Sequence, residues 1–192
     1  MDNADGMADG GLSDRALVAR AAGGETDAFD ALVRTRLDRL YVTANRIVRD
    51  SAAAEDVVQQ ALVLAWRDLH ALRDQDRFDA WLYRLLVRAC YRELRSRRRW
   101  ISTVVDLGEV RTAGTDMAIH ERDALERAFR RLTPEKRVVI VLHHVTGLAL
   151  TEISAVLELP QGTIRSRLHY GLEELRRALA PDAALDGLEE PA

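Results

Sequence analysis

The sequence predicts an all-α protein with two small helical domains joined by a flexible linker, and three observations support this prediction. The four prolines all lie at or beyond position 134, and a proline inside a helix costs about 3 kcal/mol. Apolar residues recur at steps of three and four, which is the helical period, and no segment shows the alternation of a strand. Residues 101–120 lack this period and contain two glycines, as is typical of a linker.

Three apolar stripes predict the helices of the first domain, residues 12–100. The first stripe runs from Phe29 to Val48, the second from Ala54 to Leu69, and the third begins at Phe78. Asp50 and Ser51 separate the first two stripes and supply a stop and a new N-cap. The preceding residues 1–11 are acidic and glycine-rich, so we expect them to be disordered, with neither a secretory signal nor a transit peptide.

The second domain, residues 121–180, begins with a helical pattern near Asp123. Thr133, Pro134 and Glu135 then form a strong helix start, with a capping hydroxyl, a proline at the first position and an acid facing the helix dipole. Two further helical patterns are separated at Leu159-Pro160, and the last runs from Gln161 to about Leu179. Residues 181–192 are expected to form an acidic tail.

The composition excludes several classes of protein. A single cysteine, Cys90, rules out a disulfide framework. A hydrophobic content of 47% with 31% charged residues suits a folded, core-forming chain, and no uncharged run is long enough to insert into a membrane. The formal charge of −3 argues against a nucleic-acid binder only if the charges are evenly spread.

The charges are not evenly spread. Residues 84–99 contain seven arginines against one glutamate, a local charge of +6. Five of them share one side of a helix, because they follow steps of three and four; this arginine face consists of Arg84, Arg88, Arg92, Arg95 and Arg99. Neutralising DNA phosphates with such a face releases counterions and favours binding, and nearby aromatic rings suit stacking on unpaired bases. The alternative is an ordinary solvated charged surface.

Residues 150–179 have the layout of a helix-turn-helix. Leu150, Ile153 and Val156 form the inner face of its first helix, and Leu159-Pro160 forms the turn. The second helix would present polar side chains suited to the edges of bases and to phosphates in a major groove. The alternative is a plain helical hairpin without a DNA partner.

Together the two halves resemble the extracytoplasmic-function (ECF) sigma factors of bacterial RNA polymerase, in the sigma-70 family. In the first half the resemblance is carried by FDALVRTRLDRLY, AEDVVQQALVLAWRDL and FDAWLYRLLVRACYRELRSRRR. In the second half it is carried by LTPEKRVVIVLHHVTGLALTEISAVLELPQGTIRSRL. The resemblance implies a region 2 helical bundle at 12–100, which binds core polymerase and recognises and melts the minus-ten element. It also implies a region 4 helix-turn-helix at 121–180 for the minus-thirty-five element.

The resemblance assigns site residues by position. On the clamp-binding helix they are Asp56, Gln59, Gln60 and Trp66. For the minus-ten element they are Arg73, Arg77, Phe78, Trp81, Tyr83, Arg84, Arg88, Tyr91, Arg92 and Arg95, with the loop from Leu72 to Arg77 receiving an extruded base. For the minus-thirty-five element they are Gln161, Thr163, Arg165, Ser166, Arg167, His169 and Tyr170. The implied partners are the clamp and flap of core RNA polymerase, promoter DNA and an anti-sigma factor.

Several positions differ from the family pattern. Gln60 stands where an acid is usual, and Arg88 and Arg92 stand where asparagine and aspartate are common. Ser154 and Glu158 replace the usual small residue and turn glycine. A left-handed turn at Glu158 would cost about 1 kcal/mol.

No other pattern indicates a chemical site. His143 and His144 are adjacent, so a helix directs them apart, which is poor geometry for one metal. Cys90 is expected to be a buried, inert thiol, with a redox role as the alternative. We therefore predict no catalytic centre, no metal and no cofactor, and a non-enzymatic cytoplasmic protein without membrane insertion. The rival interpretations are a conventional helix-turn-helix regulator without sigma activity and a helical adaptor that binds no DNA.

Overall fold

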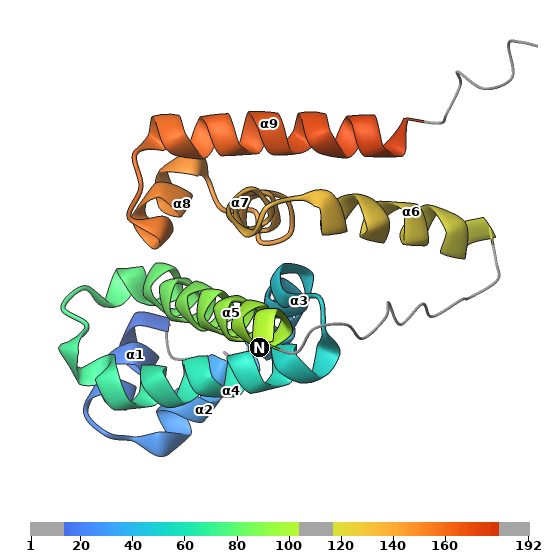
Figure 1. The fold of residues 1–192 in the computed structure, drawn as a ribbon. Helices are drawn as coiled ribbons and strands as arrows, with labels where there is room; N and C mark the ends of the chain where they lie inside the picture. The colour runs from blue at the N-terminus through green and yellow to red at the C-terminus, as the bar shows by residue number, and fades with distance from the viewer. Residues whose placement is uncertain (1–13, 104–116, 181–192) are drawn as a thin grey trace, which may run out of the picture.

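The computed structural model describes residues 14–103 and 117–180, and both ranges are helical (Figure 1). The first domain contains α1 (Asp14–Ala22), α2 (Thr26–Arg34), α3 (Leu37–Val48), α4 (Ser51–Asp68), two short 3₁₀ turns η1 (Leu69–Ala71) and η2 (Gln75–Arg77), and α5 (Phe78–Thr103). The second contains α6 (Met117–Arg131), α7 (Pro134–His144), α8 (Leu150–Leu157) and α9 (Gln161–Leu179). The all-α prediction is confirmed for these residues.

The helices enter the predicted linker from both sides. α5 continues to Thr103 and α6 begins at Met117, because neither glycine nor proline interrupts the chain at those positions. The remainder of the linker, 104–116, lies outside the described residues, as do the predicted disordered start, 1–11, and the acidic tail, 181–192.

The single helix predicted from Phe29 to Val48 is wrong, because the chain forms α2 and α3 with a turn at Thr35 and Arg36. The Thr35 hydroxyl donates to the carbonyl of Leu32 at 3.1 Å, and the amide of Arg36 donates to the carbonyl of Val33 at 2.9 Å. These bonds supply partners to carbonyl groups at the end of α2. The apolar period continues across the turn, which is why periodicity alone does not reveal it.

The predicted helix starts are confirmed. Asp50 is the N-cap of α4, and its carboxylate accepts from the amide of Ala53 at 2.8 Å. Thr133 caps α7 with Pro134 in the first turn. Such caps satisfy amides that have no partner inside the helix and typically contribute about 1 kcal/mol.

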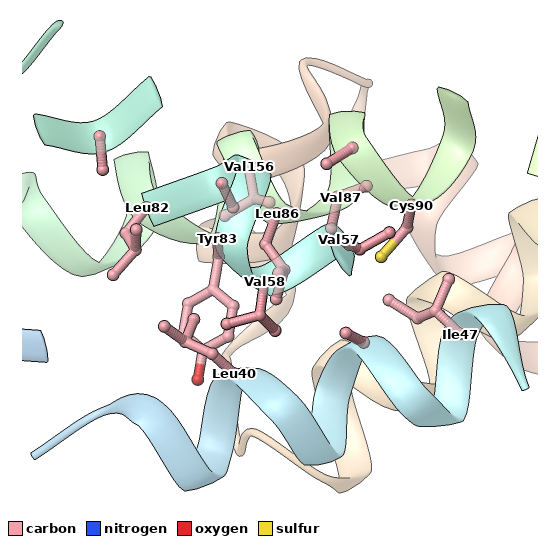
Figure 2. Packing of buried hydrophobic residues seen from close by; sticks show 14 of the residues in the cluster. Leu40, Ile47, Val57, Val58, Leu82, Tyr83, Leu86, Val87, Cys90 and Val156 are labelled. Carbon is pink, nitrogen blue, oxygen red and sulfur yellow. The ribbon is translucent and has the colours of Figure 1, made fainter. Parts of the chain in front are cut away.

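α5 forms the centre of the first domain because one side of it is almost completely buried. Leu82, Leu86 and Cys90 are 0–1% exposed, and α5 packs against α3 and α4. Cys90 lies near Ile47 and Val57 (Figure 2). The same hydrophobic cluster includes Val156 of α8. The core of the first domain is therefore continuous with part of that of the second, where a separate small cluster holds Ala128, Leu132, Ile140 and Leu175.

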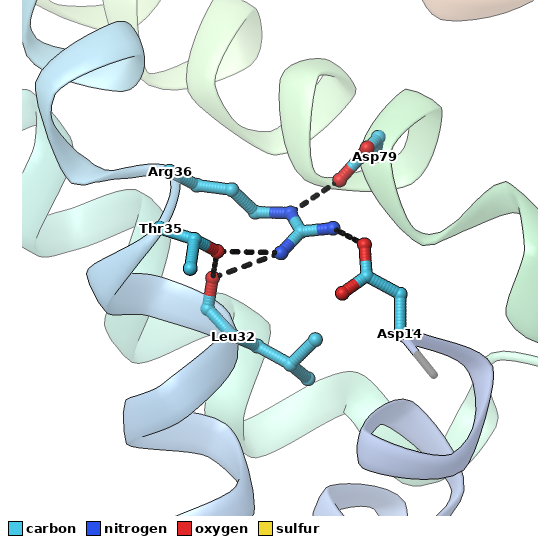
Figure 3. A network of polar contacts seen from close by, with 5 residues as sticks. All are labelled: Asp14, Leu32, Thr35, Arg36 and Asp79. Atoms are coloured by element: carbon cyan, nitrogen blue, oxygen red, sulfur yellow. Dashed lines mark hydrogen bonds and ion pairs between the residues drawn. The ribbon is translucent and has the colours of Figure 1, made fainter. Parts of the chain in front are cut away.

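Arg36 joins three helices of the first domain around one guanidinium group (Figure 3). It pairs with Asp14 of α1 and Asp79 of α5, each at 2.5 Å, and donates to the carbonyl of Leu32 at 3.1 Å. Its guanidinium also lies 5.3 Å from the centre of the Phe78 ring. Burial alone would lower the pKa of Arg36, but the two carboxylates outweigh it and the pKa is raised. A fully charged Arg36 therefore fixes α1 and the start of α5 relative to α2.

The second domain depends on a close crossing of α7 and α9 at Gly171. A Cβ atom at Gly171 would lie 2.8 Å from Cδ1 of Ile140 and 3.3 Å from Cβ of Lys136. Lys136 also pairs with Glu174 across this crossing. A side chain at this position would therefore require Ile140 and Lys136 to move.

Within the described residues, no helix is both long and apolar enough to cross a membrane.

We predict that Gly171→Val lowers the free energy of unfolding by about 1–3 kcal/mol, the usual cost of overpacking. Urea unfolding followed by circular dichroism measures this change. Gly162→Ala is the control, because Gly162 has no atom within 4 Å of the added Cβ, and it should leave stability unchanged or raise it. A Gly171→Val variant as stable as the original chain would contradict the close crossing.

Candidate nucleic-acid interface

The arginine face lies on α5, on the side away from the buried residues. Arg84 and Arg88 come two residues after Leu82 and Leu86, so they point about 200° around the helix from them. Arg84 is half-buried, while Arg88, Arg92 and Arg95 are exposed. The side chain of Arg99 lies outside the described part of the structure. The burial of one side of α5 thus forces a cationic surface on the other.

Two arginines of this face share a carboxylate from the second domain. Arg84 Nη1 and Arg88 Nη2 each lie 3.1 Å from a carboxylate oxygen of Glu158. Arg84 Nη2 also donates to the carbonyl of Ala155 at 2.7 Å. Arg92 and Arg95 instead line surface pockets on either side of α5.

The predicted aromatic stacking platform is only partly present, and this corrects the sequence-based interpretation. Phe78 and Tyr83 are 3% and 9% exposed and belong to the hydrophobic core, so their rings are not available to a base in this conformation. Trp81 and Tyr91 are partly exposed. Burial raises the pKa of Tyr91 to about 12, so its hydroxyl stays neutral at physiological pH.

The loop before α5 is held by polar contacts of Asp74 and Asp76. Asp74 caps η2 by accepting from the amide of Asp76 at 3.2 Å, and it pairs with Arg77 at 3.1 Å. Arg15 of α1 pairs with Asp76 at 2.6 Å. Arg73 and Arg77 are exposed on this loop, close in the chain to the start of the arginine face.

α4 carries the residues predicted for polymerase binding on its outer side. Asp56, Gln59 and Gln60 are exposed and line one pocket together with Arg92 of α5. Trp66 is 39% exposed, and its ring centre lies 5.1 Å from that of Phe29. Sequence reasoning missed Val63, which is 66% exposed in the same pocket. Its place one turn after Gln59 and Gln60 was the available signal.

The helix-turn-helix has the predicted layout, with α8 and α9 separated by a tight turn. Glu158 is left-handed, with φ 55° and ψ 42°, as expected for a residue in the place of a glycine. The Ser154 hydroxyl donates to the carbonyl of Leu159 at 2.5 Å. The amide of Leu159 in turn donates to the carbonyl of Ser154 at 3.2 Å. Ser154 thus braces the turn and helps to hold Glu158 in its strained conformation.

Most predicted base-reading residues share the outer side of α9. Gln161, Arg165 and His169 follow steps of four on one side, with Ser166 and Tyr170 beside them, and all five are exposed. Thr163 is partly exposed, and its carbonyl accepts from the hydroxyl of Ser166. Arg167 is the exception, because it lies in a pocket with Tyr91 and Arg95 of α5. The structure therefore separates Arg167 from the other residues predicted to face the major groove.

The remaining candidate groups have structural explanations. His143 Nδ1 lies 3.0 Å from the carbonyl of Leu148 and ties the end of α7 to the following turn. Within residues 14–103 and 117–180, no three histidine, cysteine or acidic residues come together in the manner of a metal site. Cys90 is fully buried.

Both halves of the chain match family models for sigma factors. Sigma-70 region 2 matches residues 32–100, and sigma-70 region 4 matches residues 128–177. The RNA polymerase sigma-H factor of Pseudomonas aeruginosa is 30% identical over 88% of this chain and 94% of its own length. The ECF RNA polymerase sigma-E factor of Escherichia coli K12 is 30% identical over 88% of this chain and 96% of its own length.

The chain belongs to the ECF sigma factors. It is thus a DNA-binding factor that directs RNA polymerase in transcription initiation, and a helix-turn-helix regulator without sigma activity is not favoured. The solved structure of CnrH in complex with the cytosolic domain of CnrY is similar to this sigma factor, with 29% identity and a TM-score of 0.65. It covers 88% of this chain and 99% of that one. RpoE of Bartonella quintana, solved with the anti-sigma factor NepR, has 24% identity and a TM-score of 0.63 over 80% of this chain and 98% of its own, which supports the fold.

We predict that the Cys90 thiol of this sigma factor is unreactive in the folded state. Burial raises its pKa from an ordinary value of 9.0 to about 12, so the nucleophilic thiolate is absent near neutral pH. A chromogenic disulfide reagent at pH 8 should label the native chain very slowly and should label one thiol after unfolding in urea. Because the folded state keeps this proton longer, the thiol's contribution to stability falls as the pH rises from 9 towards 12. Rapid labelling of the native chain would contradict this assignment.

Proposed function

We propose that residues 12–100 bind the clamp of core RNA polymerase and open the minus-ten element, and that residues 121–180 contact the flap and read the minus-thirty-five element. The observation that carries this proposal is the pairing of an outward arginine face on α5 with an exposed polar side on α9. The proposed mechanism is recognition and strand capture, so the polymerase performs the bond chemistry and this chain has no catalytic residue.

In this proposal the outer side of α4 docks on the polymerase clamp. Asp56, Gln59, Gln60 and Trp66 supply hydrogen-bonding groups and one aromatic anchor, and Val63 adds exposed apolar surface beside them. Anchors of this kind, surrounded by polar groups, are typical of protein interfaces. Because Gln60 carries no charge, hydrogen bonding and apolar contact would replace the charge pair usual at this position.

The loop and the arginine face would hold the separated strand. Arg73 and Arg77 lie on the loop from Leu72 to Arg77, and the arginine face continues along α5 from Arg84. A parted strand needs a cationic track for its phosphates, and arginine offers planar, two-pronged contacts to phosphate. Trp81 and Tyr91 remain as the aromatic groups that retain exposed surface for a base.

In the second domain, α9 would enter the major groove. Arg165 would contact a base edge or a phosphate, and Gln161, Ser166, His169 and Tyr170 are exposed on the same side of the helix. His169 lies 3.6 Å from Glu173, and its ring contacts that of Tyr170, so both are oriented before DNA binds. Thr163 and Arg167 would take supporting positions rather than the centre of the groove contact.

We also propose an anti-sigma factor as a partner of this chain. Family membership supports this partner, as does the solution of CnrH with the cytosolic domain of CnrY and of RpoE with an anti-sigma factor.

Run-off transcription with purified core polymerase tests the proposed function. A library of promoter fragments should yield discrete transcripts that depend on this chain. Binding of the free chain to duplex DNA with no response to core polymerase would instead identify a conventional regulator, and no DNA binding at all would identify an adaptor.

We expect Arg88→Glu with Arg92→Glu to reduce open-complex yield strongly when the variant is present at concentrations that saturate core polymerase, which allows for any weaker binding through the α4 pocket that Arg92 also lines. The reason is that the charge reversal turns two phosphate contacts into repulsions. Permanganate footprinting of unpaired thymines measures opening, and a fluorescence binding assay measures polymerase affinity. Normal opening by the double variant would contradict the role of the arginine face.

Arg165→Ala should weaken discrimination at the upstream element by about 1–3 kcal/mol if Arg165 reads a base. Competition binding with single-base variants of the element measures this loss. An equal loss on every sequence would show that Arg165 contacts a phosphate instead.

A further inference from the structure

Two carboxylates of the second domain are each shared by two arginines of the first domain. Glu158 lies between Arg84 and Arg88, as described above. Glu126 of α6 lies 2.5 Å from Arg46 and 3.1 Å from Arg49, both near the end of α3. These four ion pairs join two separate parts of the second domain, α6 and the turn after α8, to the first domain.

Arginine side chains also cross the interface to main-chain carbonyls. Arg137 of α7 is 7% exposed; it donates to the carbonyl of Ile47 at 2.9 Å and to that of Leu132 at 3.0 Å. Arg39 donates to the carbonyl of Thr146 at 3.0 Å. Ile47 and Leu132 lie at the ends of α3 and α6, where carbonyl groups lack helical partners and carry partial negative charge. Arg137 therefore joins two helix ends from different domains.

The contacts are not equally strong. Arg137 and Arg49 are well buried, whereas the side chains of Arg88 and Glu158 are 61% and 57% exposed. Exposed ion pairs contribute little to stability and are weakened by salt. The contact at Glu158 is thus the one that a polyanion such as DNA can displace most readily.

We propose that the free chain adopts a closed form in which Glu158 takes the place of a DNA phosphate between Arg84 and Arg88, so that the second domain competes with promoter DNA for the arginine face. This inference rests on the proposed role of the arginine face in holding the minus-ten strand. Glu158 stands where the family pattern has a glycine, and Arg88 stands where asparagine is common. The two departures therefore meet in one ion pair that a chain with the usual residues would lack.

The closed form explains two features of the chain that are each unfavourable by themselves. A left-handed glutamate is strained by about 1 kcal/mol, yet this conformation directs the carboxylate onto two guanidinium groups. A row of like charges on one helix face is also unfavourable, and Glu158 neutralises part of it when DNA is absent. Each cost is reduced by the contact with the other domain.

Two double variants with the same change of charge test the proposal. Glu126→Gln with Glu158→Gly removes both carboxylates that cross the interface, and glycine accepts the left-handed turn without strain. The control is Glu152→Gln with Glu173→Gln. Glu152 accepts from the amide of Ala149, and Glu173 pairs with His169 and Arg177, so these contacts stay within the second domain. Circular dichroism checks that each variant is folded.

The first readout is binding of a fluorescent twelve-nucleotide oligothymidylate to the full-length chain at low salt. This probe is suitable because phosphate contacts to the arginine face do not depend on base sequence. The interface variant should bind about three- to tenfold more tightly than the original chain. The control variant should show no more than the small gain due to its net charge. Equal affinities for the two double variants would overturn the proposal.

The second readout is the distance between spin labels at Asp30→Cys of α2 and Arg176→Cys of α9, which are both exposed. The buried Cys90 stays unlabelled. The original chain should give one narrow distance distribution, and the interface variant a longer and broader one. A broad distribution in the original chain would show that the closed form is absent and would overturn the proposal. Because both readouts use the free chain, they are independent of run-off transcription, so failure of the proposed function would be seen separately.

Discussion

The burial of one side of α5 is the constraint on which the rest of the structure depends. Leu82, Leu86 and Cys90 fill the space between α3 and α4 and are almost inaccessible to water. Removing apolar surface of this size from water contributes about 1.5–3 kcal/mol per large side chain. Because that side is buried, helix geometry directs the arginines of the opposite side outward: Arg84, Arg88, Arg92 and Arg95. The same helix thus supplies the core of the first domain and its cationic surface.

The second domain makes both apolar and ionic contacts with the first domain around α5. Val156 of α8 joins the hydrophobic cluster that contains Leu86, while Glu158, two residues later, reaches Arg84 and Arg88. Apolar contact positions α8, and the ion pairs act only because that position exists. Binding of DNA along the arginine face would remove the polar part of this contact, and the apolar part would then have to separate as well. The opening of the chain and the binding of DNA are linked through one helix.

Helical periodicity and caps predict much of this architecture from sequence, because they depend on neighbouring residues. Asp50 and Thr133 start helices as expected. The left-handed turn at Glu158 was instead implied by the family resemblance, which places Glu158 where a turn glycine is usual. The break at Arg36 was not predicted, because the apolar period continues across it. The ion pairs of Arg36 with Asp14 and Asp79, which are distant in sequence, were equally invisible to local periodicity. Phe78 and Tyr83 were expected to contact DNA, since aromatic rings beside arginines suit that role. Their burial is decided by neighbouring helices, including α3, which local periodicity does not reveal.

When transcription begins, Arg84 and Arg88 would exchange the carboxylate of Glu158 for promoter phosphates. The most direct measurement is a structure of this chain bound to core RNA polymerase and an opened promoter. In this complex we expect Arg84 and Arg88 to contact the DNA backbone, with Glu158 and α8 moved away from α5. An opened complex in which Glu158 still lies between the two arginines would contradict this exchange.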